Sequence, residues 1–136
     1  MASNNNEKTL KKQPERTIIF TGGGTGGHVY PNLALIPEFK KRGFLPVYVG
    51  GEGNTIERQL ARDIGTRYYG IPTIKLKRSL SLDALNNNLK IPSELGKAVK
   101  AASEIIAKIK PDCVFSKGGF VSLPVVLAAK KANVPI

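Results

Sequence analysis

Short apolar runs alternate with segments of helical periodicity along most of the chain. The apolar runs predict β-strands at residues 17–21, 44–50, 67–71 and 112–116,. Segments with apolar residues at helical spacing predict α-helices at about 31–42, 54–63, 93–110 and 123–133,. Residues 134–136 have the pattern of a fifth strand at its beginning. Because strands and helices alternate, we predict an α/β fold with a parallel sheet and right-handed crossovers.

Proline and glycine residues mark several helix boundaries. Gly43 is suited to end the first helix, and Pro92 to open the third,. Pro37 lies inside the first helix, which it should kink or weaken,. Asn54 and Glu57 have the spacing of a capping box, so Asn54 is the predicted N-cap of the second helix,. Residues 75–90 mix leucines with basic residues and asparagines, and the pattern assigns them no element.

Two glycine-rich segments follow predicted strands. The first glycine loop comprises residues 22–28 and follows the first strand, and the second comprises residues 117–120 and follows the fourth. We predict a Rossmann-like, doubly wound sheet with the strand order 3-2-1-4-5, in which the first and fourth strands are neighbours. The two glycine loops should therefore face one crevice at the carboxyl edge of the sheet.

Composition supports one globular domain. The apolar fraction is 41% of 136 residues, and no apolar run approaches the roughly 20 residues that cross a bilayer,. Residues 1–16 are polar and aperiodic, so we expect a disordered leader or tag-like tail there and the domain at 17–136,. One cysteine and one histidine cannot assemble a structural zinc site, and the single cysteine agrees with a cytosolic setting,.

The net charge of +11 is high for this length. It favours a polyanionic partner, which could be nucleic acid, anionic lipid headgroups or a phosphorylated substrate. The chain has no RNP-like aromatic strand, no zinc finger and no helix with a dense stripe of cations, so we expect no nucleic-acid partner,. A solvated surface with a basic tail remains the simpler explanation of the scattered lysines.

The first glycine loop suits an anion. A strand, a glycine turn and a helix N-terminus in that order present free N–H groups and the positive end of a helix dipole. Gly22, Gly24 and Gly27 also satisfy the dinucleotide fingerprint, and Glu52 could bind a ribose, so an NAD-type domain is an alternative,. No Gly-Lys-Ser/Thr follows, which excludes a P-loop,. A tight turn without a ligand is the remaining explanation.

Both loops resemble those of one enzyme family. Residues 23–31, which read GGTGGHVYP and are followed by Leu33 and Ala34, resemble the first glycine loop of the MurG family. Residues 111–124, which read PDCVFSKGGFVSLP, resemble that family's second glycine loop and the helix after it. The resemblance covers roughly 17–136 and implies the N-terminal half of a GT-B glycosyltransferase. The family's His-Glu-Gln-Asn motif and C-terminal donor-binding domain do not occur in the sequence, so we expect this chain alone to be inactive or nearly so.

The resemblance implies a reaction. MurG enzymes move N-acetylglucosamine from UDP-N-acetylglucosamine to the C4 hydroxyl of an undecaprenyl-diphosphate-linked muramoyl pentapeptide, a step of peptidoglycan synthesis. The implied partners are these two substrates and a C-terminal domain or partner chain that completes the site. Neither the residues nor the resemblance implies a metal or other cofactor. A non-catalytic binding subunit, as in the split eukaryotic relatives that act on dolichol-linked sugars, is the alternative.

The resemblance also assigns roles within the loops. His28 is the candidate general base, because its unperturbed pKa suits proton abstraction near neutrality, and a helix-capping role is the alternative. Lys117 is a candidate phosphate ligand, with an ordinary surface lysine as the alternative. Phe120 is expected only to support its loop. The residues expected to hold the acceptor diphosphate are Gly23, Gly24, Thr25, Gly26, Gly27, Lys117, Gly118 and Gly119. Partial donor contacts are expected from Thr25, Gly26, Gly27 and His28.

A third segment combines leucines with cations. It suits a surface that enters a headgroup layer, with an ordinary amphipathic helix as the alternative. We therefore expect peripheral attachment to an anionic membrane surface, at its cytoplasmic face. The contacting residues are expected to be Ile74, Lys75, Leu76, Lys77, Arg78, Leu80 and Leu82.

Overall fold

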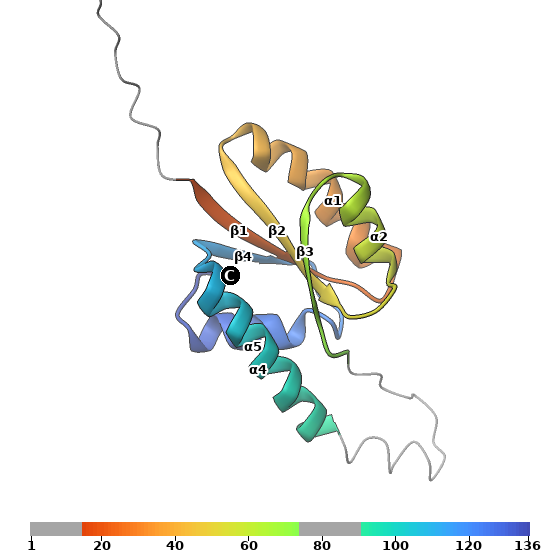
Figure 1. Ribbon diagram of the computed structural model, residues 1–136, viewed down its shortest axis with the longest axis vertical. Helices are drawn as coiled ribbons and strands as arrows, with labels where there is room; N and C mark the ends of the chain where they lie inside the picture. The colour runs from red at the N-terminus through yellow and green to blue at the C-terminus, as the bar shows by residue number, and fades with distance from the viewer. Residues whose placement is uncertain (1–14, 74–90) are drawn as a thin grey trace, which may run out of the picture.

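The computed structural model describes residues 15–73 and 91–136. The described strands form one parallel four-stranded sheet in the order β3-β2-β1-β4. The strands are β1 (Arg16–Thr21), β2 (Phe44–Gly51), β3 (Arg67–Ile71) and β4 (Cys113–Ser116). The helices are α1 (Gly26–Lys41), α2 (Ile56–Asp63), α4 (Ile91–Ile109) and α5 (Leu123–Lys131). Helices α1 and α2 cover one face of the sheet, and α4 and α5 cover the other (Figure 1).

Alternate residues of β1 enter opposite cores. Ile18 and Phe20 pack on the side of α1 and α2, together with Ile36 and Ala61. Ile19 packs on the side of α4 and α5. Because both faces of a parallel sheet are covered by helices, a central strand of this kind is apolar at every position rather than at every second one. That is why the central strands stand out in the sequence.

The predicted order of the first four strands, 3-2-1-4, is confirmed. Thr21 at the end of β1 is level with Val49 of β2 on one side and with Ser116 of β4 on the other. The N–H of Lys117 donates to the Thr21 carbonyl at 3.1 Å, so the loops after β1 and β4 start side by side. Residues 134–136 have no strand assignment, but the Val114 N–H donates to the Pro135 carbonyl at 2.8 Å. The end of the chain therefore lies along β4, where a fifth strand was expected.

The first helix starts earlier than the sequence predicted. Helix α1 begins at Gly26, not near Pro31, so the last part of the first glycine loop is a helical turn. Thr25 has extended dihedral angles (φ −144°, ψ 153°) and is the N-cap, although its side chain makes no capping hydrogen bond. The error arose because glycines read as a turn in sequence, whereas here the free N–H groups belong to the first turn of α1. The helix continues through both Pro31 and Pro37.

The predicted capping box of α2 is wrong. Thr55 is the N-cap, and its hydroxyl accepts a hydrogen bond from the Arg58 N–H at 3.3 Å. Asn54 instead accepts from the side chain of Gln59 at 2.9 Å. Glu57 does not turn back to the helix end but points inward and is buried. The interior beneath the first glycine loop therefore holds an acidic side chain that the sequence pattern placed at the surface.

Strand β1 begins at Arg16, which pairs with Phe44 and which the sequence prediction had assigned to the tail. Residues 1–14 lie outside the described residues. The same holds for the predicted membrane contacts, Ile74, Lys75, Leu76, Lys77, Arg78, Leu80 and Leu82. Within 15–73 and 91–136, none of the helices combines the length and the apolar character that crossing a bilayer requires.

Candidate functional site

The two glycine loops are in van der Waals contact at the carboxyl edge of the sheet. A Cβ atom built on Gly119 would lie 3.1 Å from the Gly23 carbonyl oxygen, and one built on Gly22 would lie 3.5 Å from the Gly118 carbonyl oxygen. Gly118 and Gly119 have φ values of 97° and 88°, which side-chain-bearing residues resist,. The predicted adjacency of the two loops is therefore confirmed, and it depends on the absence of side chains.

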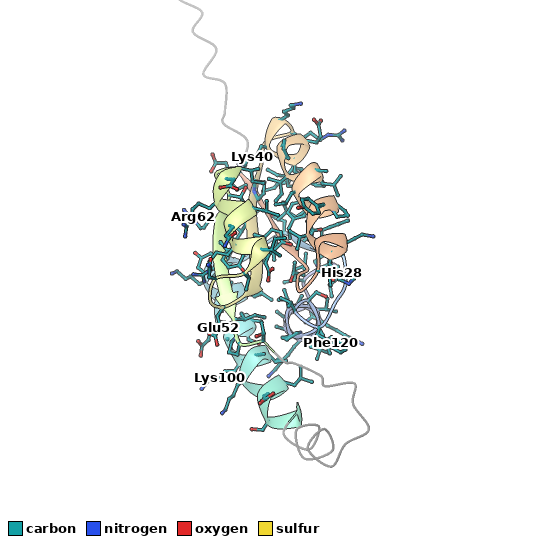
Figure 2. The ribbon with its side chains drawn as sticks, turned by 90° about the vertical axis from the view of Figure 1, so that its right-hand side faces the viewer. His28, Lys40, Glu52, Arg62, Lys100 and Phe120 are labelled. Atoms are coloured by element: carbon teal, nitrogen blue, oxygen red, sulfur yellow. The ribbon has the colours of Figure 1, made fainter. Side chains whose placement is uncertain are left out.

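His28 lies between the two loops. It belongs to the first turn of α1, and its N–H donates to the Thr25 carbonyl at 3.1 Å. Its ring lies against the second loop, because a Cβ on Gly119 would be 3.2 Å from Cδ2 and a Cβ on Gly118 would be 3.9 Å from Cε1 and Nδ1. Figure 2 shows His28 at the start of α1 and Phe120 in the loop after β4 on the same side of the molecule. Among the described residues the imidazole has no hydrogen-bond partner, so it does not cap the helix.

The other predicted site residues surround this ring. Gly23 is buried, Gly24 and Gly27 are exposed, and Gly26 is half-buried in the first turn of α1. Thr25 and Lys117 are both exposed. The structure therefore brings both glycine loops, the histidine and one lysine together at a single edge. This edge is where ligands bind in open α/β sheets.

A buried polar group that sequence reasoning missed supports the first loop from below. Asn32 of α1 donates through Nδ2 to the Thr21 carbonyl at 3.0 Å and to the Tyr48 hydroxyl at 3.1 Å. Tyr48 of β2 in turn donates to the Gly22 carbonyl at 2.7 Å. Burial raises the pKa of Tyr48 to about 12, so the hydroxyl stays a donor. A single Asn on the covered face of a helix was the only sequence signal for this arrangement.

A second tyrosine holds the end of β2. The Tyr68 hydroxyl donates to the Gly51 carbonyl at 2.7 Å and lies 3.3 Å from the Thr55 hydroxyl. Burial raises the pKa of Tyr68 to about 12 as well. The rings of Tyr48 and Tyr68 are stacked, with centroids 5.8 Å apart and planes 10° from parallel. The carbonyl of Gly22, directly after β1, and that of Gly51, at the end of β2, thus each accept a hydrogen bond from a tyrosine hydroxyl.

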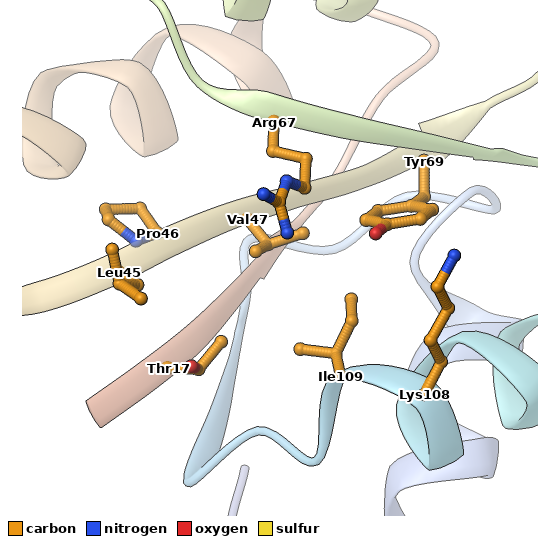
Figure 3. Close-up of a pocket in the computed structure, with 8 residues that line it drawn as sticks. All are labelled: Thr17, Leu45, Pro46, Val47, Arg67, Tyr69, Lys108 and Ile109. Carbon is orange, nitrogen blue, oxygen red and sulfur yellow. The ribbon is translucent and has the colours of Figure 1, made fainter. Parts of the chain in front are cut away.

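A cavity of about 330 Å³ lies at the opposite edge of the sheet. Arg67 and Lys108 extend into the space between β3 and α4, and the Lys108 Nζ lies 5.7 Å from the centre of the Tyr69 ring (Figure 3). This cavity is at the amino ends of the strands and contains none of the predicted site residues. We therefore place the candidate site at the glycine loops rather than in the cavity.

Residues 18–136 match the glycosyltransferase family 28 N-terminal domain. The match covers most of the chain and includes both glycine loops, both strands that precede them and His28. The chain belongs to this family. Family membership favours the glycosyltransferase interpretation of the first glycine loop over the NAD-type one.

The names of curated relatives are more specific than the family description. The chain is similar to UDP-N-acetylglucosamine–N-acetylmuramyl-(pentapeptide) pyrophosphoryl-undecaprenol N-acetylglucosamine transferases of several bacteria. It is 47% identical to the Lachnospira eligens protein over 121 residues, which cover 89% of this chain and 33% of that protein. It is 50% identical to the Oceanobacillus iheyensis protein over 121 residues, which cover 88% of this chain and 32% of that protein. The chain thus spans about a third of the length of the curated relatives it matches.

Solved structures agree on the fold. The Acinetobacter baumannii MurG crystal structure matches with a TM-score of 0.72 and 27% identity, over 88% of this chain and 33% of that one. The calicheamicin glycosyltransferase CalG4 matches with a TM-score of 0.61 and 22% identity, over 90% of this chain and 31% of that one. These matches confirm the predicted Rossmann-like α/β domain of a GT-B glycosyltransferase.

Proposed function

We propose that this chain is the acceptor-side domain of an N-acetylglucosaminyltransferase. The reaction moves N-acetylglucosamine from UDP-N-acetylglucosamine to the C4 hydroxyl of an undecaprenyl-diphosphate-linked muramoyl pentapeptide. The names of the relatives support this reaction. The observation that carries the proposal here is the close approach of the two glycine loops, with the ring of His28 from the first loop against the second.

In this proposal His28 is the general base. The acceptor hydroxyl attacks the anomeric carbon of the donor, the bond from that carbon to the UDP oxygen breaks, and the hydroxyl proton passes to the imidazole. The ring is suited to this role, because it has no hydrogen-bond partner among the described residues and is only half-buried. Its contact with Gly119 limits how far it can turn.

The acceptor diphosphate lies against the first turn of α1. The N–H groups at the start of a helix have no partners within the helix and attract anions. In the proposal they act together with the N–H groups of Gly118 and Gly119, the Thr25 hydroxyl and the Lys117 ammonium, and Thr25, Gly26, Gly27 and His28 also contact the donor. Among these groups the His28 N–H already donates to the Thr25 carbonyl and the Gly118 N–H to the Ser116 hydroxyl, so a bound diphosphate would compete for these two donors,.

Protein beyond these 136 residues completes the donor site in this proposal. The relatives are about three times as long as the matched region, which leaves room for a second domain. That part could be joined to this chain or be a separate partner chain. In either case we expect little or no transfer by residues 1–136 alone.

We also propose peripheral attachment at the cytoplasmic face of the membrane. The acceptor named for the relatives carries an undecaprenol lipid, and the chain has a net charge of +11,. Residues 74–82 would supply the contact. The chain should sediment with anionic vesicles more than with neutral ones, and replacement of Lys75, Lys77 and Arg78 by Ser should reduce this by about tenfold or more. Equal binding to both vesicle types, or no loss in the triple variant, would remove the proposal.

A titration followed by amide chemical shifts tests acceptor binding. Farnesyl diphosphate, a short polyprenyl diphosphate, should shift the amides of residues 22–28 and of Gly118 and Gly119, whereas farnesol should not. Lys117→Gln should weaken this binding by about threefold to tenfold, and Lys130→Gln, at the far end of α5, should leave it unchanged. Tight binding of NAD at the first glycine loop would instead support the dinucleotide-binding alternative.

A further inference from the structure

A carboxylate lies directly beneath the first glycine loop. Glu57, in the first turn of α2, is only 1% exposed. Its Oε1 accepts a hydrogen bond from the Gly51 N–H at 3.2 Å, and its Oε2 is buried with no hydrogen-bond partner among the described residues. No ion pair joins it to a cation within 15–73 and 91–136. Burying a carboxylate with so few partners is costly, which calls for a physical reason.

Three glycines border this side chain, and at Gly23 it is the nearest group. A Cβ on Gly23 would lie 2.6 Å from Glu57 Oε1. A Cβ on Gly50 would lie 2.9 Å from Glu57 Cγ and 2.5 Å from the Tyr68 hydroxyl, and one on Gly51 would lie 3.2 Å from Oε1 and 2.7 Å from Thr73 Cγ2. None of the three has a φ in the left-handed region, unlike Gly22 and Gly24. The backbone conformation therefore does not require glycine at these three positions. At Gly23 the Glu57 carboxylate leaves no room for a Cβ, and at Gly50 and Gly51 it shares that effect with Tyr68 and Thr73.

The Glu57 carboxylate is part of a buried layer that binds the ends of β1 and β2. Its negative charge adds to the effect of burial in raising the pKa of Tyr48 and of Tyr68. These phenols donate to the carbonyls of Gly22 and Gly51, and Glu57 accepts the N–H of Gly51. Each of these three side chains thus hydrogen-bonds the backbone at the carboxyl end of β1 or β2.

We propose that Glu57 is a positioning residue for the first glycine loop. Its carboxylate fixes the backbone at Gly23 from below and ties it to Gly51, so that the N–H groups of the following turn keep the direction in which a ligand needs them. The ligand-binding role of that turn rests on the proposed function. The effect of Glu57 on the loop does not, and it can be measured without a ligand.

A double-mutant cycle tests the contact between Glu57 and Gly23. Gly23→Ala and Glu57→Ala should each destabilise the chain in urea. The double variant should lose clearly less stability than the sum of the two single losses, because the new methyl group enters space that the carboxylate has left. Gly24→Ala is the matched control, since Gly24 has a φ of 81° and nothing within 4 Å of its added Cβ. When Gly24→Ala is combined with Glu57→Ala, the loss of stability should equal the sum of the two single losses.

Amide hydrogen exchange tests the positioning itself. In Glu57→Ala the amides of residues 22–27 should exchange about tenfold faster than in the parent chain. The exchange rates of core amides, such as those of Ile19 and Val49, should rise by a smaller factor that is the same for all of them. Glu57→Gln, which keeps the shape and an acceptor oxygen, should restore slow exchange in the loop. Farnesyl diphosphate binding should fall by about tenfold in Glu57→Ala and stay within about threefold of the parent in Glu57→Gln.

Additive losses in the Gly23 and Glu57 cycle, or equal acceleration of loop and core amides, would overturn the proposal. If Glu57→Ala does not fold, Gly23→Ala must still show the same local exchange pattern, because the added methyl displaces the carboxylate. Failure of farnesyl diphosphate to bind the parent chain would contradict the proposed function alone. The exchange and stability results would still decide the role of Glu57.

Discussion

Tyr48 shows how one side chain connects the core to the candidate site. Its ring is fully buried on the face of the sheet that α1 and α2 cover, and its hydroxyl donates to the Gly22 carbonyl at 2.7 Å. An apolar residue would fill the same space, but the Gly22 carbonyl would lose this donor and the Asn32 amide would keep only its hydrogen bond to the Thr21 carbonyl. The phenol therefore connects the first glycine loop to the core.

The raised pKa of Tyr48 makes this contribution depend on pH. The folded chain holds the pKa at about 12, above the ordinary value of 10.0 expected for the unfolded chain. The stabilisation is therefore complete below about pH 10 and is lost as the pH rises from about 10 to about 12. Tyr68 should contribute in the same direction, because its pKa is also raised to about 12.

Urea unfolding across this range provides the measurement. Tyr48→Phe should cost about 1–3 kcal/mol at pH 7 and should show a shallower loss of stability between about pH 10 and 12 than the parent chain. Tyr30→Phe is the matched control, since Tyr30 is 58% exposed, and it should leave both values unchanged. An unchanged pH dependence in Tyr48→Phe would contradict the assignment.

At the scale of elements, the strands and their order could be predicted, because continuous apolar runs are the signature of strands covered on both faces. The start of α1 could not, since Gly26 and Gly27 have poor helix propensity and adopt helical geometry only because Thr25 ends the extended segment,. The inward turn of Glu57 could not be predicted either. The local spacing of Asn54 and Glu57 fits a capping box, in which Glu57 would turn back to the start of α2. Only the tertiary contact with Gly23, Gly50 and Gly51 shows that Glu57 points inward instead.

The meeting of the two glycine loops gives an element-scale prediction. In Gly119→Ala the new Cβ would approach the Gly23 carbonyl oxygen at 3.1 Å and His28 Cδ2 at 3.2 Å, at a φ of 88°. Gly53→Ala is the matched control, because Gly53 has a φ of 89° and nothing within 4 Å. Both variants should lose about 1–2 kcal/mol from the strained backbone, and Gly119→Ala should lose more.

The imidazole signals separate the two effects. The His28 ring resonances should shift in Gly119→Ala and stay in place in Gly53→Ala, as seen in carbon–proton correlation spectra. Identical stability losses with no movement of the His28 signals would mean that the second loop does not hold the ring.

At the scale of the whole molecule, the candidate site residues of the described domain lie together at one edge of the sheet. Both glycine loops, His28 and Lys117 lie at the carboxyl ends of β1 and β4, and the cavity with Arg67 and Lys108 lies at the other edge. The sequence predicted the fold and the members of this edge, because each motif directly follows a strand. The polar layer beneath was missed, since its members are far apart in sequence and each is unremarkable alone.

Transfer of labelled N-acetylglucosamine shows whether this chain is the acceptor-side domain of the enzyme. This chain would be joined to the part of the Lachnospira eligens relative that follows the matched region, and given UDP-N-acetylglucosamine with a polyprenyl-diphosphate-linked muramoyl pentapeptide. We expect turnover by the joined protein, none by the chain alone, and a loss of about 10²-fold or more in His28→Asn with little change in acceptor binding. A joined protein that folds and binds both substrates but transfers no sugar, or that is unaffected by His28→Asn, would contradict this assignment.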